Sequence, residues 1–118
     1  MTTKNPLVSV IMNCHNGELY LKESIDSLIN QTYRNWEMIF WDNVSTDNSK
    51  KILDQFKDKR IKYFKSNKFT SLYEARNLSI EKAQGDYIGF LDTDDLWHKE
   101  KIEKQINFLK KNSDYKVV

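Results

Sequence analysis

Short apolar runs alternate along the chain with longer segments in which apolar residues recur at helical spacing. The run Leu7–Met12 is rich in β-branched residues, which is typical of a parallel strand buried on both faces. Three further runs are interpreted as strands: Trp36–Trp41, Ile61–Phe64 and Asp86–Leu91. Clusters of polar residues follow the first, second and fourth of these strands directly.

Four helices are predicted between and after the strands. In Glu18–Gln31 one apolar stripe is formed by Leu21, Ile25, Leu28 and Ile29. The other helices are expected after the cap residues Ser45–Asp47, over Ser71–Gln84 and from Trp97 onward. The third begins with a capping box of Ser71 and Glu74, and Gly85 is expected to end it.

Strict alternation of strands and helices predicts the α/β class, with a mainly parallel sheet in a Rossmann-like, three-layer α/β/α domain. With 118 residues the chain has room for one domain, over residues 1–118. Ligands of such sheets bind beyond the carboxyl ends of the strands. Three polar clusters are expected to converge there: Asn13–Asn16, Asp42–Asp47 and Asp92–Asp95.

The cluster Asp92–Asp95 holds three carboxylates within four residues. Its simplest interpretation is a helix cap, since Asp94 and Asp95 directly precede the predicted last helix. A cap accounts for one carboxylate, whereas three at this spacing repel one another, and a divalent cation relieves that repulsion. Carboxylate oxygens suit a hard ion such as Mg²⁺ or Mn²⁺. A calcium-binding EF-hand loop is excluded, because Trp97 stands where that loop requires glycine.

The other polar side chains near the strand ends each have a structural and a functional interpretation. Asp42 and Asn43 suit either a polar turn or the recognition of a base edge or a ribose hydroxyl. Arg76 is either a surface arginine or, near the inner stripe of its helix, a ligand-binding residue. His15 is either an acid or base or a polar loop residue, and Cys14 is interpreted as a small buried apolar residue.

Composition narrows the possible functions. The chain has three glycines, at no spacing that gives a glycine-rich phosphate loop. Its net charge of +2 gives no electrostatic case for nucleic acid or an anionic membrane. One cysteine excludes an internal disulfide. No apolar run nears the roughly 20 residues that span a bilayer, and no signal-peptide pattern is present, so cytoplasmic residence is expected.

Several stretches at compatible spacing together resemble one known family. They are Val8–Asn16, Tyr20–Tyr33, Glu37–Asp47, Ala75–Asn77 and Ala83–Asp95, and they cover nearly the whole chain. In this order they resemble the family 2 glycosyltransferases, whose fold is called GT-A. The resemblance implies metal-dependent, inverting transfer of a sugar from a nucleoside diphosphate sugar, with a UDP-sugar expected. It also implies a saccharide or lipid-linked acceptor, the latter at the inner face of the membrane.

The resemblance also implies roles for individual residues. Asn13, His15, Asp42 and Asn43 fall where the family holds the base and ribose, and Arg76 falls where an arginine contacts base or phosphate.

In the same way, the acidic cluster matches the DxD-type element of the family. This element binds the ribose and the metal on the pyrophosphate, so Asp92 and Asp94 are expected to bind the donor. Asp94 and Asp95 are expected to hold Mg²⁺ or Mn²⁺.

Two residues depart from the family pattern. Asn43 stands where the family often has a second aspartate, which implies altered base recognition. His15 stands where the family usually has an aromatic residue that stacks on the base, and imidazole stacks more weakly.

The family domain is usually about twice as long as this chain. We therefore expect no catalytic base before Val118, donor binding without efficient transfer, and a bare edge on the Tyr87–Leu91 strand that favours self-association. Two alternatives are a non-catalytic nucleotide-binding or assembly module and a receiver-like signalling domain. The receiver needs an acidic pair after the first strand, where this chain has Asn13-Cys14-His15.

Overall fold

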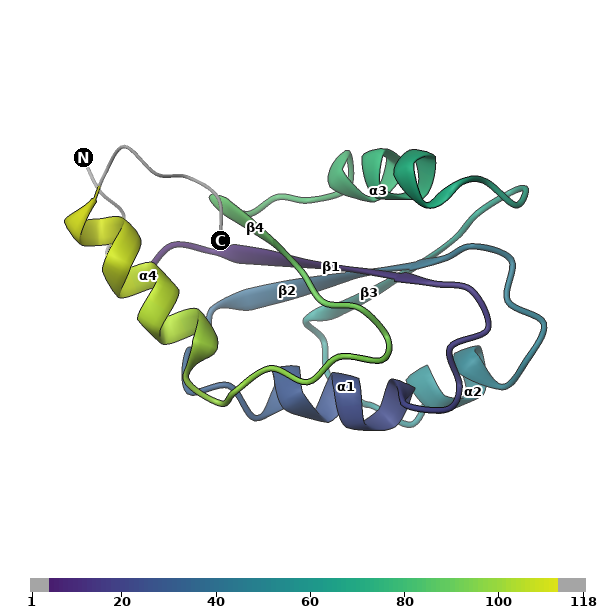
Figure 1. The fold of residues 1–118 in the computed structure, drawn as a ribbon, viewed down its shortest axis with the longest axis horizontal. Coiled ribbons are helices and arrows are strands. Elements are labelled where there is room, and N and C mark those ends of the chain that lie inside the picture. Colours follow the sequence, from purple (N-terminus) through teal and green to yellow (C-terminus); the bar gives the residue numbers. More distant parts are fainter. Residues whose placement is uncertain (1–4, 113–118) are drawn as a thin grey trace.

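A computed structural model describes residues 5–112 of the chain. Four parallel strands form one sheet in the order β3-β2-β1-β4 (Figure 1). Their bounds are Val8–Cys14 for β1, Trp36–Asp42 for β2, Ile61–Lys65 for β3 and Tyr87–Phe90 for β4. The predicted α/β class and parallel sheet are therefore confirmed.

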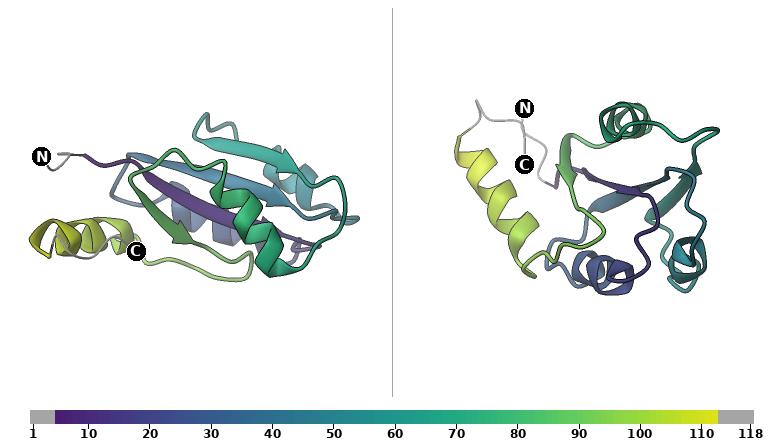
Figure 2. Two further views of the ribbon diagram at one scale, coloured as in Figure 1. Left: turned by 90° about the horizontal axis from the view of Figure 1, so that it is seen from above. Right: turned by 45° about the vertical axis from the view of Figure 1, so that its right-hand side comes forward.

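Helices cover both faces of the sheet and make it three layers deep. Their bounds are Leu21–Ile29 for α1, Ser49–Leu53 for α2, Leu72–Ile80 for α3 and Lys101–Lys111 for α4. Helices α1 and α2 lie on one face and α3 on the other, while α4 lies at the end where β1 begins (Figures 1 and 2). All residues of β1 and β2 except Asn13 are buried, because both strands are central and covered on both faces.

The main core lies between the sheet and α1. Alternate residues of β1 and β2 point toward this helix, which contributes the predicted stripe residues Leu21, Ile25 and Leu28. Ile102 and Ile106 of α4 join the same cluster. The α3 face is thinner and more polar, with Ala75 and Ser79 buried from the helix side.

Two helix boundaries differ from the sequence prediction. Helix α3 begins with the predicted cap, in which Ser71 Oγ accepts from the Glu74 amide, but it ends at Ile80. Gly85 therefore does not end this helix. It is needed for close approach, because a Cβ at Gly85 would lie 2.5 Å from Ser9 Oγ.

The second difference concerns the acidic cluster. Helix α4 begins at Lys101 with Glu100 as its N-cap, so Asp94 and Asp95 do not cap it. The helix-cap interpretation of the cluster is wrong, and its three carboxylates need another explanation.

At the amino end of the sheet, one buried carboxylate joins three elements. Glu37 of β2 accepts from Ser9 Oγ at 2.6 Å, Lys62 Nζ at 2.7 Å and the Gln84 amide at 2.7 Å. Ser9 Oγ in turn accepts from the Gly85 amide. Burial alone raises the pKa of Glu37, but these donors outweigh it and hold its pKa below the ordinary value.

Candidate functional site

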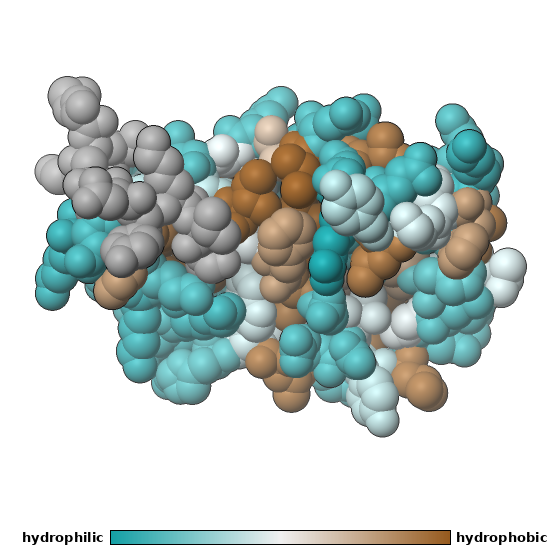
Figure 3. All heavy atoms as spheres, turned by 45° about the horizontal axis from the view of Figure 1, so that its top comes forward, coloured by the Kyte–Doolittle hydropathy of each residue, from teal (hydrophilic) through white to brown (hydrophobic). Residues whose placement is uncertain are grey.

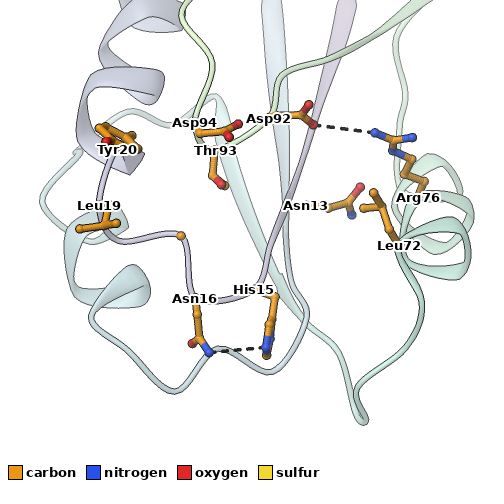
Figure 4. A pocket seen from close by; sticks show the side chains of 11 residues that line it. Asn13, His15, Asn16, Leu19, Tyr20, Leu72, Arg76, Asp92, Thr93 and Asp94 are labelled. Carbon is orange, nitrogen blue, oxygen red and sulfur yellow. Dashed lines mark hydrogen bonds and ion pairs between the residues drawn. The ribbon is translucent and has the colours of Figure 1, made fainter.

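A pocket of about 450 Å³ opens beyond the carboxyl ends of β1 and β4. It is surrounded by the loop after β1, the start of α1, helix α3 and the loop after β4 that carries Asp92–Asp95, which we call the acidic loop (Figure 4). It brings together five of the predicted binding residues: Asn13, His15, Arg76, Asp92 and Asp94. These residues lie up to 81 positions apart in the sequence, and the parallel topology places them at one edge.

The charged side of the pocket combines a guanidinium with exposed carboxylates. Arg76 Nη2 lies 3.8 Å from Asp92 Oδ1, and the two side chains are 41% and 62% exposed. The guanidinium also lies over the Phe90 ring, 5.4 Å from its centroid. A pair this long and exposed holds its partners weakly, so both groups are available to a ligand.

Helix α1 fixes the main chain of the acidic loop. Ser24 is fully buried, and its Oγ lies 2.8 Å from the Asp92 carbonyl oxygen and 2.6 Å from that of Asp95. Ser27 Oγ accepts from the Trp97 amide. Because α1 holds only the main chain, the carboxylates of this loop stay exposed while their positions are defined.

The loop after β1 approaches the acidic loop closely at a glycine. A Cβ at Gly17 would lie 2.8 Å from Thr93 Oγ1, so a larger residue there would push the two loops apart. Asn13, at the wall of the pocket, donates from Nδ2 to Ser79 Oγ of α3 at 2.7 Å. Its side-chain orientation is thereby fixed.

A second pocket of about 200 Å³ adjoins the first and shares Asn13, His15 and Leu72 with it. It is also lined by Cys14 at the end of β1, by Asn43 at the tip of β2, and by Phe69, Thr70 and Ser71 of the segment between β3 and α3. His15 Nδ1 lies 2.8 Å from the Asn43 carbonyl oxygen. Because a carbonyl only accepts, Nδ1 donates this bond and carries the ring proton.

Asp42 and Asp95 line neither of these pockets. The Asp42 carboxylate is buried and accepts from the Ser45 amide and from Tyr63 Oη. Burial is the larger cause and the hydrogen bond to Asp42 the smaller cause that raise the pKa of Tyr63 above its ordinary value. Asp95 is exposed at the far end of the acidic loop. Their predicted roles in ribose and metal binding therefore stay predictions.

Among residues 5–112 no group of three or more carboxylate, imidazole or thiolate side chains is arranged to hold a metal ion. Asp92 and Asp94 nonetheless present exposed carboxylates to the same pocket. Magnesium is commonly held by one or two carboxylates together with substrate phosphates, so the Asp94 carboxylate at this pocket fits a hard cation that arrives with a diphosphate.

Sequence reasoning missed several residues of the two pockets. Leu19, Tyr20 and Leu72 line the larger pocket and are all more than half exposed, and Phe69 of the smaller pocket is 61% exposed. A signal was present for Phe69, which is an apolar residue isolated in the polar run between β3 and α3. In the structure this ring does not stand alone, because it lines the smaller pocket together with His15 and the exposed Leu72.

Comparison with known proteins agrees with this geometry. The model of the family described as Glycosyl transferase family 2 matches residues 9–118. The chain belongs to this family. An uncharacterized glycosyltransferase of Haemophilus influenzae is 48% identical over 91% of the chain, which corresponds to 44% of that relative.

One relative and one solved structure carry more specific names. The UDP-Glc:alpha-D-GlcNAc-diphosphoundecaprenol beta-1,3-glucosyltransferase WfgD of Escherichia coli is 40% identical over 91% of the chain and 42% of that protein. The crystal structure of S. aureus TarS 1–349 in complex with UDP-GlcNAc superposes with a TM-score of 0.84 at 27% identity, over 88% of this chain and 31% of the TarS 1–349 chain.

These matches confirm the GT-A fold and the predicted family. The chain spans less than half the length of the curated relatives that it matches. Within residues 5–112, no helix has the length and apolar character needed to cross a membrane.

Proposed function

We propose that this chain is the donor-binding part of a glycosyltransferase and that it binds a nucleoside diphosphate sugar in the pocket between β1, α3 and the acidic loop. The observation that carries the proposal is the convergence of Arg76 with Asp92 and Asp94 in one open pocket at the carboxyl edge of the sheet. The names of WfgD and of the TarS complex favour a UDP-sugar as donor.

The diphosphate is expected to lie between Arg76 and the acidic loop. Arg76 offers a permanent positive charge with several donors, and Asn13 and His15 offer further polar groups toward the nucleoside. We propose that Asp94 and Asp95 hold Mg²⁺ or Mn²⁺ and that Asp92 binds the ribose. A divalent ion held there supplies positive charge to the diphosphate leaving group.

Transfer of the sugar is proposed to invert the anomeric carbon in a single displacement, with a saccharide or lipid-linked hydroxyl as the acceptor. Such a displacement needs a general base on the face opposite the diphosphate. We assign that base to none of residues 5–112. The name of WfgD favours a lipid-linked acceptor. Cytoplasmic residence stays a prediction.

Isothermal titration calorimetry with UDP and Mn²⁺ tests the proposal. The unmodified chain is expected to bind UDP in a metal-dependent manner, and Asp94→Asn is expected to weaken binding by about tenfold or more. Asp95→Asn tests the second metal ligand, and Asp54→Asn, at a residue that lines neither pocket, serves as a matched control. Equal, metal-independent binding by the unmodified chain and by both variants of the acidic loop would refute the metal site.

We also propose self-association through β4, which lies at one edge of the sheet. Its Phe90 is 40% exposed, and apolar side chains gather in the middle of the face that carries β4 and α3 (Figure 3). An unpaired strand edge offers backbone donors and acceptors to a second chain. Sedimentation velocity at high concentration is expected to show a dimer, and a monomer throughout would contradict this.

A further inference from the structure

The smaller pocket has two features that the proposed donor site leaves unexplained. One is the exposed ring of Phe69. The other is that each polar group of Asn43 already has a hydrogen-bond partner within the protein. The side chain of Asn43 is 6% exposed, and it faces the segment between β3 and α3. Together these features determine which residue contacts a base and which residue positions it.

Asn43 makes a two-way amide bridge to the main chain of Thr70. Its Nδ2 donates to the Thr70 carbonyl oxygen at 2.9 Å, and its Oδ1 accepts from the Thr70 amide at 3.0 Å. The Asn43 amide donates to the Cys14 carbonyl oxygen at 2.7 Å, and the Asn43 carbonyl accepts from His15. All four polar groups of this residue therefore connect the loops that form the pocket.

A buried amide with both ends satisfied gains little by turning toward a ligand. Turning the Asn43 amide toward a base edge would break both of its side-chain hydrogen bonds and leave the Thr70 main chain without these partners. The bridge instead holds Thr70, and with it the neighbouring Phe69, at a fixed distance from the tip of β2.

Phe69 forms one corner of the pocket together with His15. The ring centroids lie 4.7 Å apart and the planes meet at 63°, so the rings touch edge to face. Phe69 is still 61% exposed, which leaves most of its ring surface free. The pocket of about 200 Å³ is walled by these rings and by the segment Thr70–Leu72, and it opens into the larger pocket through Asn13, His15 and Leu72.

We propose that Phe69 is the aromatic surface on which the base of the nucleotide stacks, a proposal that rests on the proposed donor site. Asn43 is then a positioning residue that holds Phe69 through Thr70 and does not read the base. Stacking of the base on Phe69 then replaces the stacking expected of an aromatic residue at position 15. His15 has a smaller ring there, and this ring already contacts Phe69 edge to face. Tyr20 is the competing platform, since it lines the larger pocket, but it lies on the side of that pocket beside Asp94, across from Arg76 and Leu72 (Figure 4).

The test compares a ligand that has a base with one that lacks it. Calorimetry with Mn²⁺ measures the affinity of each variant for UDP and for inorganic pyrophosphate. Phe69→Ala is expected to weaken UDP binding by about tenfold, as expected for the loss of one stacked base, and to leave pyrophosphate binding unchanged. Phe69→Trp is expected to restore UDP affinity. Tyr20→Ala tests the competing platform. Tyr73→Ala, at an exposed aromatic residue of α3 that lines neither pocket, is the matched control, expected to leave UDP affinity within about twofold.

The role of Asn43 is tested by base discrimination. UDP and CDP differ in the donors and acceptors of their base edges, so a residue that reads the edge changes the ratio of the two affinities when it is removed. Asn43→Ala is expected to weaken both nucleotides by a similar factor and to leave their ratio unchanged. A changed ratio would overturn the positioning role.

The outcomes separate this inference from the proposed function. If Tyr20→Ala weakens UDP binding and Phe69→Ala does not, the stacking role of Phe69 is wrong, while the donor site stands. If the unmodified chain binds neither UDP nor pyrophosphate, both proposals fail together.

Discussion

The two ends of the sheet use similar charged residues in opposite ways. At the amino end, Glu37 is 4% exposed and its ion pair with Lys62 is 2.7 Å long. At the carboxyl end, the ion pair between Arg76 and Asp92 is 3.8 Å long and both partners are largely exposed. The first arrangement satisfies every oxygen of the carboxylate inside the protein, and the second leaves charge available to a ligand.

This difference separates the end of the sheet that is held by its own side chains from the end that is proposed to bind the donor. Hydrogen bonds to the buried carboxylate of Glu37 join β1, β2, β3 and the segment before β4, so the amino end is fixed. The carboxyl end is held mainly through main-chain contacts, such as those of Ser24 with the acidic loop. Its side chains are thereby positioned without being neutralised.

The largest expected effect comes from breaking the amino end. Glu37→Gln keeps the shape of the side chain but removes the charge that faces Lys62, Ser9 Oγ and the Gln84 amide. We expect the free energy of unfolding to fall by about 2–4 kcal/mol, because the charge is lost and one of the two acceptor oxygens becomes an NH₂ group that faces hydrogen-bond donors. Urea denaturation measures this, with Glu81→Gln on an exposed helix end as the control. A loss no greater than that of the control would contradict the network's role.

Breaking the ion pair between Arg76 and Asp92 at the carboxyl end is expected to affect ligand affinity and to leave stability nearly unchanged. Asp92→Asn is expected to change the free energy of unfolding by less than about 0.5 kcal/mol, because exposed pairs contribute little. Affinity for UDP in the presence of Mn²⁺ is expected to fall about tenfold, since the ribose loses a charged acceptor. Thermal melting and calorimetry on the same sample give both values. A large loss of stability would mean that this pair is structural.

A smaller effect is expected from pH. The folded pKa of Glu37 lies below its ordinary value of 4.5, despite burial, because Lys62, Ser9 and the Gln84 amide donate to it. Its contribution to stability is therefore complete above pH 4.5 and is lost as the pH falls through the folded pKa. Denaturation series between pH 7 and pH 3 are expected to show a shallower fall for Glu37→Gln. Identical slopes would assign the acid sensitivity to other groups.

The smallest expected effect concerns backbone strain in the loop that follows β2 at the carboxyl end. Val44, in the loop after β2, has φ of 56°, a left-handed conformation that costs a β-branched residue roughly 1–2 kcal/mol. Val44→Gly removes this cost but adds flexibility to the unfolded chain. We expect a net stabilisation of about 0.5 kcal/mol, seen as a higher melting temperature. A lower melting temperature would show that side-chain contacts of Val44 outweigh the strain.

Much of the fold could be predicted from the pattern of apolar residues. The strands and the stripe of α1 were found because burial on two faces or on one face imposes a clear period. The end of α3 and the start of α4 were misplaced because Gly85 and Asp95 were interpreted from local preferences. In the structure, contacts with Ser9 and Ser24 decide their conformation.

For the site, the alternation of strands and helices was enough to predict that Asn13 and Asp92 lie at one edge, because parallel strands end together, whereas the binding role of Arg76 was expected from the family resemblance. The partner of Asn43 could not be predicted, since Thr70 is 27 residues away and contributes only main-chain atoms. The hydrogen-bond network of Glu37 could not be predicted for the same reason. Glu37 stands in an apolar run, and its partners come from three other segments.

Nuclear magnetic resonance of the ¹⁵N-labelled chain, titrated with UDP and Mg²⁺, tests the central claim most directly. The claim is that the carboxyl end binds the donor while the amino end is purely structural. Amide shifts are expected in residues 13–17, 69–71 and 92–94, with none at Ser9, Gln84 or Gly85. Shifts centred on the amino end, or no shifts at saturating UDP, would contradict the account.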